Sequence, residues 1–337
     1  MVPYTTARRD ATCSLYLLPW IQVFERSVHR QMDNNRNLDD SQEPLFSKQG
    51  HSLKENLIQD VYSILVQKNQ ANIECRRKPR CFSHGKIVEG VLLMCDYFQQ
   101  RQEARYIAIV LVERFLSAKC AILFGELSAS TQRKKDKFLQ WRNFMESLKE
   151  QAFLYIIACC QIAFKICCHQ QTVSNKQNVQ LMQGITSTST VNNIALCELD
   201  VLQSVNYELP FTTILTFTET LLGMLGSNQN YDFSIKTLHN VCLKILDLVC
   251  LRRYDIFDRL FESTVENITG LKERSKFVMV ENDDLLLSTG VIETATYISN
   301  KEKHMQVLND LNRLTNIPRV DILDLSSVLL ETILPGF

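Results

Sequence analysis

One helix in this sequence is apolar on almost every side, and this feature limits the folds that the chain can adopt. The helix is expected near Leu148–Cys168, with Lys165 interrupting its C-terminal end. Its apolar residues are Phe153, Leu154, Ile156, Ile157, Ala158, Ile162, Ala163, Phe164 and Ile166. A soluble chain buries such a helix by surrounding it with other helices, so the sequence predicts that it forms the centre of a helical bundle.

A second helix is expected near Asn193–Val205, beyond a polar connection. Glu198 lies near its start, and its apolar repeat is Leu196, Leu199, Leu202 and Val205. A charge that is buried without a partner is costly. Lys165 and Glu198 are therefore expected either to pair with each other or to contact a partner protein.

The composition indicates an all-α fold. The chain has 337 residues, enough for two domains, and contains only 10 Gly and 7 Pro among long apolar-periodic runs. The formal net charge is zero, so no overall field attracts nucleic acid, and no direct nucleic-acid contact is expected. No stretch approaches the roughly 18 uninterrupted apolar residues that a membrane span requires, so no membrane partner is expected either.

The 12 cysteines indicate a reducing compartment, the cytosol or the nucleus, rather than a disulfide scaffold. Several lie inside apolar helical runs, where free cysteine behaves as a small hydrophobe. These are Cys95, Cys159, Cys160, Cys242 and Cys250. No cysteine or histidine set has the spacing of a zinc site, so no structural metal is expected.

Four segments are expected along the chain. Residues 1–51 form a flexible N-terminal segment, 52–80 an N-terminal helix and basic connector, 81–209 a first helical domain and 210–337 a second, diverged one. Helices are expected near 52–69, 86–99, 103–118, 148–168, 193–205, 211–225, 233–251, 254–267, 282–299, 302–314 and 319–333.

A basic cluster of Arg76, Arg77, Lys78 and Arg80 is a candidate nuclear import signal. The alternative is a solvated connector between two helices, because such clusters are common on protein surfaces.

Residues 126–146 contain a second basic run, Arg133-Lys134-Lys135-Asp136-Lys137, and are expected to form a charged loop. Such a loop is long for a helical bundle, where connections usually take about 2–8 residues. It could contact phosphate or simply be a solvated loop.

No catalytic motif is present. The sequence contains neither a glycine-rich phosphate loop nor the motifs of zinc proteases and serine hydrolases, and its 6 histidines have no metal spacing. The chain is therefore not expected to be an enzyme or to hold a cofactor.

Three segments resemble the cyclin family. They are VLVERFLS at Val110–Ser117, QIAFKICC at Gln161–Cys168 and CELDVLQSVNYELPFTTILTF at Cys197–Phe217. The resemblance covers roughly residues 81–335, is strong in the first domain and is loose in the second. It implies tandem cyclin-fold five-helix bundles preceded by an N-terminal helix.

Within the cyclins, four details are most similar to a divergent, crossover-associated meiotic branch. They are ELDVLQSVNYEL, the following FTETLLGMLG, LDLV at 246–249 and the basic stretch that ends in Trp141-Arg142. The resemblance implies a regulatory subunit of a cyclin-dependent kinase that acts in meiotic prophase, promotes crossover maturation and lies in the nucleus on meiotic chromosomes. Meiotic recombination factors are the other implied partners. The alternative is a kinase-independent scaffold for recombination or ubiquitin-ligase factors.

The resemblance also assigns roles to individual residues. Lys165 and Glu198 stand where cyclins bind the C-helix region of the kinase, and Ile166 and Tyr207 stand where apolar groups contact the same helix. Leu154 matches a core leucine of the family.

The chain departs from the cyclin pattern at several positions. Glu113 replaces an Asp that cyclins pair with a first-helix Arg, and Ser83 or His84 stands at that Arg position. The substrate-docking patch of the family falls over Ser83–Val91, where Gly90 occupies the position of a Trp, so recruitment of substrates through this patch is not expected. Cys167 and Cys168 replace acidic residues that follow the family's lysine.

Overall fold

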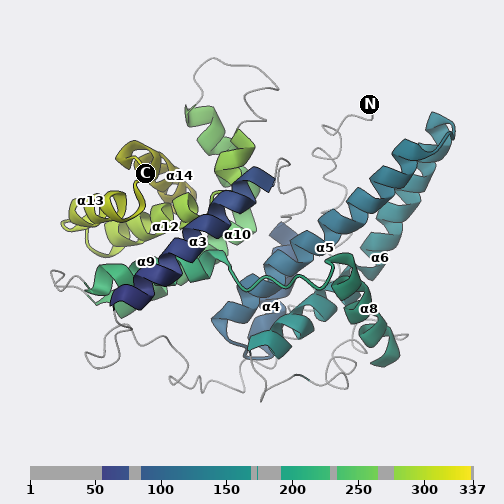
Figure 1. Cartoon of the computed structure of the whole chain (residues 1–337), viewed down its shortest axis with the longest axis horizontal. Coiled ribbons are helices and arrows are strands. Elements are labelled where there is room, and N and C mark those ends of the chain that lie inside the picture. Colours follow the sequence, from purple (N-terminus) through teal and green to yellow (C-terminus); the bar gives the residue numbers. More distant parts are fainter. Residues whose placement is uncertain are drawn as a thin grey trace. The chain divides into compact units, whose positions relative to one another are not determined.

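The computed structural model describes residues 55–75, 85–167, 173, 191–227, 234–264 and 277–334, and every regular element in these ranges is a helix. The all-α prediction is therefore confirmed for the described part of the chain (Figure 1). Three features of the sequence analysis lie outside the described residues. They are the expected flexible segment 1–51, the basic cluster at 76–80, and the pair Ser83 and His84.

The helices form two compact units, and the chain passes from the first to the second between Phe211 and Thr212. The sequence placed this boundary between Leu209 and Pro210. The first unit contains α4 (Gly85–Tyr97), α5 (Gln102–Ala129), α6 (Lys134–Cys167) and α8 (Val191–Ser204). The second contains α3 (Glu55–Cys75), α9 (Ile214–Ser227), α10 (Ile235–Thr264), a short helix at 277–281, α12 (Asp284–Ser299), α13 (His304–Thr315) and α14 (Arg319–Ile333).

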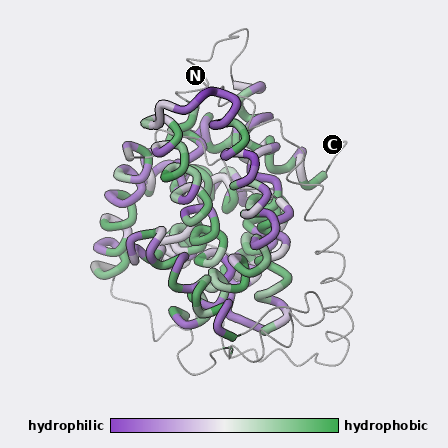
Figure 2. The backbone as a smooth tube through the Cα atoms, turned by 90° about the vertical axis from the view of Figure 1, so that its right-hand side faces the viewer, coloured by the Kyte–Doolittle hydropathy of each residue, from purple (hydrophilic) through white to green (hydrophobic). Residues whose placement is uncertain are grey.

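The C-terminal half of α6 is the core of the first unit. Every residue from Ile156 to Phe164 is buried, because α4, α5 and α8 all pack against this helix. Aromatic rings reinforce this packing, with Phe98 beside Phe164 and Phe115 beside Tyr155. The predicted central helix is therefore present. Along most helices, hydrophobic and hydrophilic positions alternate as expected for amphipathic helices around a core (Figure 2).

The prediction of a loop at 126–146 is wrong. Helix α5 continues to Ala129 and α6 already begins at Lys134, so the connection consists only of residues 130–133. The two helices form a hairpin, in which the Lys137 ammonium donates to the Ser130 carbonyl oxygen at 2.7 Å. The stretch contains no Gly or Pro, and its charges alternate with apolar residues at helical spacing. Its polarity reflects exposed helix surface rather than a loop.

Two positions of the Ser83–Val91 patch lie in the core of the first unit. Gly90 and Val91 are both buried on α4. A Cβ atom at Gly90 would lie 3.5 Å from Ile156 Cδ1, which is ordinary van der Waals contact with α6. These two positions therefore belong to the core of the first unit and contribute nothing to a peptide-docking surface.

Helix α12 is the core of the second unit, and every residue from Asp284 to Thr296 is buried. It packs against α9, α10, α13, α14 and α3. Its hydroxyl side chains donate to carbonyl oxygens one turn earlier in the same helix, so they are buried without losing hydrogen bonds. A Cβ atom at Gly290 would lie 2.6 Å from the Leu325 side chain, so glycine allows α14 to approach closely.

Two helices that the sequence predicts at 233–251 and 254–267 form the single element α10. The element bends at Arg252, whose φ of −118° and ψ of 23° are not helical. The break therefore lies at the junction that the sequence indicated.

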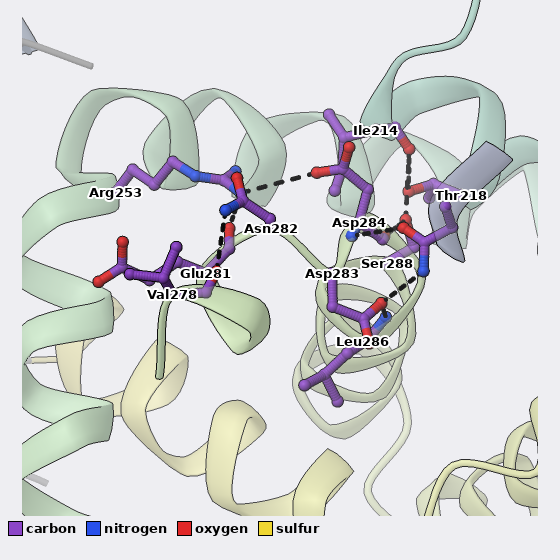
Figure 3. A network of polar contacts seen from close by, with 11 residues as sticks. Ile214, Thr218, Arg253, Val278, Glu281, Asn282, Asp283, Asp284, Leu286 and Ser288 are labelled. Atoms are coloured by element: carbon purple, nitrogen blue, oxygen red, sulfur yellow. Dashed lines mark hydrogen bonds and ion pairs between the residues drawn. The ribbon is translucent and has the colours of Figure 1, made fainter. Parts of the chain in front are cut away.

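Helix α3 precedes the first unit in the sequence, yet it packs in the second. Its buried Asn69 donates to Asp283 Oδ1 at 2.9 Å and accepts from the Asp284 backbone N–H at 3.0 Å. The Asp283 carboxylate also caps α12 by accepting from the Leu286 N–H at 2.9 Å. Figure 3 shows this polar network at the start of α12. Burial raises the pKa of the Asp283 carboxyl, although its hydrogen bonds oppose the shift.

Candidate functional site

The two charged residues that the sequence singled out meet at the junction of α6 and α8. Lys165 Nζ lies 2.7 Å from Glu198 Oε2. The Lys165 side chain is 46% exposed and the Glu198 side chain only 13%. The two residues therefore pair with each other, and the ammonium group remains accessible from solvent.

The Glu198 carboxylate is only half satisfied. Its second oxygen, Oε1, is buried and accepts no hydrogen bond from the described residues. A buried acceptor without a donor costs free energy, and a charged one costs more than a neutral one. The pair therefore retains unused hydrogen-bonding capacity on the acidic side as well as on the basic side.

Helix α8 turns a different face to the core from the one that its leucine repeat predicted. Ile194 and Val201 are buried, whereas Leu196 and Leu199 are 65% and 44% exposed. The prediction was wrong for these two leucines because α8 carries more apolar residues than one face can hold. Ile194 and Val201 are seven residues apart, which places them on one side of a helix, and Val205 continues that side. The spacing of these β-branched residues was the available signal.

Asp200 anchors a different side of α8 from Glu198. Residues two positions apart on an α-helix point in directions about 200° apart. The Asp200 carboxylate accepts from Lys119 Nζ at 2.6 Å and from the Tyr155 hydroxyl at 3.1 Å. Burial and the nearby Asp200 charge raise the pKa of Tyr155. Burial also raises the pKa of the Cys197 thiol, with Lys119 opposing the shift. The sequence did not reveal this cluster, since it joins residues from three helices.

The chain leaves α8 through two residues in the left-handed region, Asn206 with φ 53° and Tyr207 with φ 60°. This conformation is unusual for a bulky residue such as tyrosine. It is held by the Tyr207 N–H, which donates to the Leu202 carbonyl oxygen at 2.8 Å. Arg114 on α5 reaches the Glu208 carbonyl oxygen at 3.4 Å. The exposed Tyr207 ring is therefore carried by a fixed backbone turn.

The remaining predicted site residues lie around this junction. Ile166, next to Lys165 in the last turn of α6, is half-buried. Glu113 is buried on α5. Leu154 is half-buried and lies just before the fully buried stretch of α6, so it is at the edge of the core rather than inside it.

Within the described residues, no group of three or more His, Cys, Asp and Glu side chains is placed to hold a metal ion. Of the described helices, α6 alone is long and apolar enough to cross a membrane. Half of its apolar window is buried inside the protein, as expected for the central helix of a bundle.

Comparison with known proteins gives two similar relatives. The mouse protein named cyclin N-terminal domain-containing protein 1 is 30% identical to this chain over 268 residues, which are 79% of this chain and 80% of the mouse protein. The human protein of the same name is 30% identical over 275 residues, 81% of this chain and 83% of the human protein. No protein-family model and no solved structure matches the chain.

Proposed function

Because the chain belongs to the family of cyclin N-terminal domain-containing protein 1, we propose that it is a divergent cyclin, the regulatory subunit of a cyclin-dependent kinase. In this proposal its two helical units are tandem cyclin folds. In this proposal the catalytic groups all belong to the kinase. The chain acts by holding the C-helix of the kinase in the position that completes the kinase's internal Lys–Glu pair, which phosphate transfer requires. This is a shift in the population of kinase conformations.

The observation that carries this proposal is the Lys165–Glu198 pair. Its two residues stand at the positions that the cyclin resemblance assigns to kinase binding, and they meet at 2.7 Å across two helices. The pair is partly solvated, with an accessible ammonium and an unsatisfied carboxylate oxygen. The exposed Lys165 ammonium can donate to a backbone carbonyl oxygen of a kinase without first breaking a fully buried ion pair.

Apolar side chains support the same surface. Leu199 is exposed next to Glu198, Ile166 is half-buried next to Lys165, and Tyr207 is exposed just beyond the end of α8. A charged pair with apolar neighbours suits an interface, because burial of the apolar groups excludes water from the charge-assisted hydrogen bonds. We propose that these residues contact the kinase.

The meiotic part of the proposal depends on the segments around ELDVLQSVNYEL and FTETLLGMLG, which resemble the crossover-associated branch of the cyclins. We propose that the protein acts in the nucleus on meiotic chromosomes during prophase, that it promotes crossover maturation and that it associates there with recombination factors.

Co-purification tests the kinase partnership. The full-length chain is co-expressed with each member of a panel of cyclin-dependent kinases, purified through a tag on the chain, and assayed for kinase activity. We expect one kinase to co-elute in a stoichiometric complex and to phosphorylate a generic substrate faster than the free kinase. If no kinase co-elutes, the proposal fails, and the scaffold for recombination or ubiquitin-ligase factors becomes the better explanation of the cyclin resemblance.

A further inference from the structure

The hairpin of α5 and α6 extends beyond the core of the first unit. The last buried residue of α5 is Cys120 and the first of α6 is Ile156. Throughout the fully described stretch from Ala121 to Glu150, no side chain is buried. We call residues 121–150 the outer hairpin. Its two helices have each other as packing partners, so each has a side that no third helix of the described unit covers (Figure 1).

Large apolar side chains lie on the surface of the outer hairpin. Ile122 on α5 is 55% exposed, and Phe138 on α6 is 64% exposed. Leu139 and Phe124 are also exposed. Helical stability in proteins comes mainly from packing an amphipathic face, so two helices with apolar groups still in water form an incomplete bundle. The outer hairpin therefore has the properties of a docking surface for a further helix.

The end of the outer hairpin is basic. Between Thr131 and Arg142 the chain has the cations Arg133, Lys134, Lys135, Lys137 and Arg142, and Asp136 is the one acid. Arg133, Lys134 and Lys135 are exposed. Lys134 and Lys135 also stand in the first turn of α6, where the helix dipole disfavours cations. A negatively charged partner would offset this unfavourable arrangement.

We propose that the outer hairpin binds an acidic amphipathic helix of a partner protein, which completes a three-helix bundle. The apolar side of that helix covers Ile122, Phe138 and Leu139, and its acidic residues face Lys134 and Lys135. Nucleic acid is the less suitable partner, because phosphate contacts would use the cations and leave the apolar side chains in water. This surface is separate from the Lys165–Glu198 pair, and the inference does not depend on a kinase partner.

Fluorescence anisotropy with the full-length chain tests the proposal. The probe is a fluorescein-labelled peptide of roughly 20 residues, made of Leu and Glu in an amphipathic helical pattern. The comparison probes are a scrambled peptide of the same composition, a Leu and Lys peptide of the same pattern, and a DNA duplex of roughly 20 base pairs. We expect saturable binding of the Leu and Glu helix at tens of micromolar, roughly tenfold tighter than any comparison probe.

Two sets of substitutions locate the binding surface. Ile122→Ser/Phe138→Ser/Leu139→Ser removes the apolar contacts, and Lys134→Glu/Lys135→Glu reverses the charge. Each set should weaken peptide binding at least about tenfold. Val191→Ser/Leu196→Ser on α8 is the matched control, because it removes similarly exposed apolar groups of the same unit, and it should leave peptide binding unchanged. All these positions are exposed, so no variant should lower the melting temperature. The charge reversal should raise it slightly, because it places two acids in the first turn of α6.

Several results would overturn the proposal. One is the absence of saturable peptide binding up to about 100 μM. Another is equally tight binding of the scrambled peptide. A third is tighter binding of the DNA duplex than of the Leu and Glu peptide, with the duplex affinity lowered by the charge reversal and unchanged by the serine substitutions. Self-association of the full-length chain in sedimentation experiments, abolished by the serine substitutions, would also overturn it by assigning the outer hairpin to a second copy.

Discussion

Removing either member of the Lys165–Glu198 pair should affect kinase binding far more than stability. The two alanine variants are not equivalent, since the Lys165 side chain is 46% exposed and the Glu198 side chain 13%. Lys165→Ala removes a half-solvated ammonium but leaves the more buried carboxylate without this donor. This variant loses a surface ion pair, worth at most about 1 kcal/mol, and leaves a partly desolvated carboxylate. We therefore expect the free energy of unfolding to fall by about 1–2 kcal/mol.

Glu198→Ala should be the milder change. It deletes the carboxylate together with its buried and unsatisfied Oε1, and Lys165 can turn to water. We expect a loss of no more than about 1 kcal/mol. Thermal melting followed by circular dichroism should therefore show a shift of a few degrees for Lys165→Ala and a smaller one for Glu198→Ala.

Kinase binding should respond strongly to both variants. Loss of one partner of a charge-assisted contact at an interface weakens binding by about 2–5 kcal/mol, which is roughly 30-fold to several thousandfold in Kd. Titration calorimetry with the kinase identified by co-purification measures this change. Lys119→Ala is the matched control: it breaks a pair of 2.6 Å with Asp200 in the same unit, and it should cost similar stability without weakening kinase binding.

Two results would refute this reasoning. If either Lys165→Ala or Glu198→Ala lowers stability by about 3–5 kcal/mol, the pair is a structural ion pair whose breaking strands a buried charge. If kinase binding survives both changes, the surface around the pair is not the kinase-binding surface.

Three further predictions concern other parts of the chain. Replacing the four basic residues of Arg76–Arg80 with alanine should move a fluorescent fusion toward the cytoplasm, whereas unchanged nuclear accumulation would reduce the cluster to a solvated connector. Asp283→Asn keeps an N-cap oxygen but cannot ionise. Because the pKa of Asp283 is raised in the folded state, the wild type loses stability as pH rises from about 4 through that folded pKa. The variant should therefore gain melting temperature over the wild type at pH 7 and lose this advantage below pH of about 4; an equal difference at both pH values would contradict the assignment. Gly290→Ala should destabilise the second unit by about 1–3 kcal/mol in urea unfolding, because the added Cβ would lie 2.6 Å from the Leu325 side chain; an unchanged midpoint would mean that α14 moves freely.

The sequence predicted best those elements whose burial is nearly complete. The stretch Ile156–Phe164 is apolar except for Gln161, so its position at the centre of a unit did not depend on choosing a face. Lys165 and Glu198 were also identifiable from the sequence, because a charge is conspicuous among the apolar residues of a helix. The face of α8 was not predictable in this way, since apolar residues occupy several of its sides and tertiary packing selected Ile194 and Val201.

Other features depend on contacts that a linear pattern does not contain. Asp200, Lys119 and Tyr155 are ordinary polar residues within their own helices, and only the packing of three helices joins them. The helical segment at 126–146 was mistaken for a loop because exposed helices and loops are both polar. The absence of glycine and proline between 126 and 146 was the better guide.

The position of α3 in the second unit has a consequence for the order of folding during synthesis. Asn69 must wait for its hydrogen-bond partner Asp284, which is 215 residues later in the chain. At the usual translation rate of about 5–20 residues per second, this delay is roughly 10–40 s, and the first unit is synthesised in the meantime. Until α9 has been synthesised, the face of α3 that carries Leu65 has none of the helices it will pack on, and an exposed amphipathic helix is prone to aggregation. Closure of the second unit is therefore a late, long-range step, and the nascent chain should be a client of chaperones that shield helical apolar surfaces.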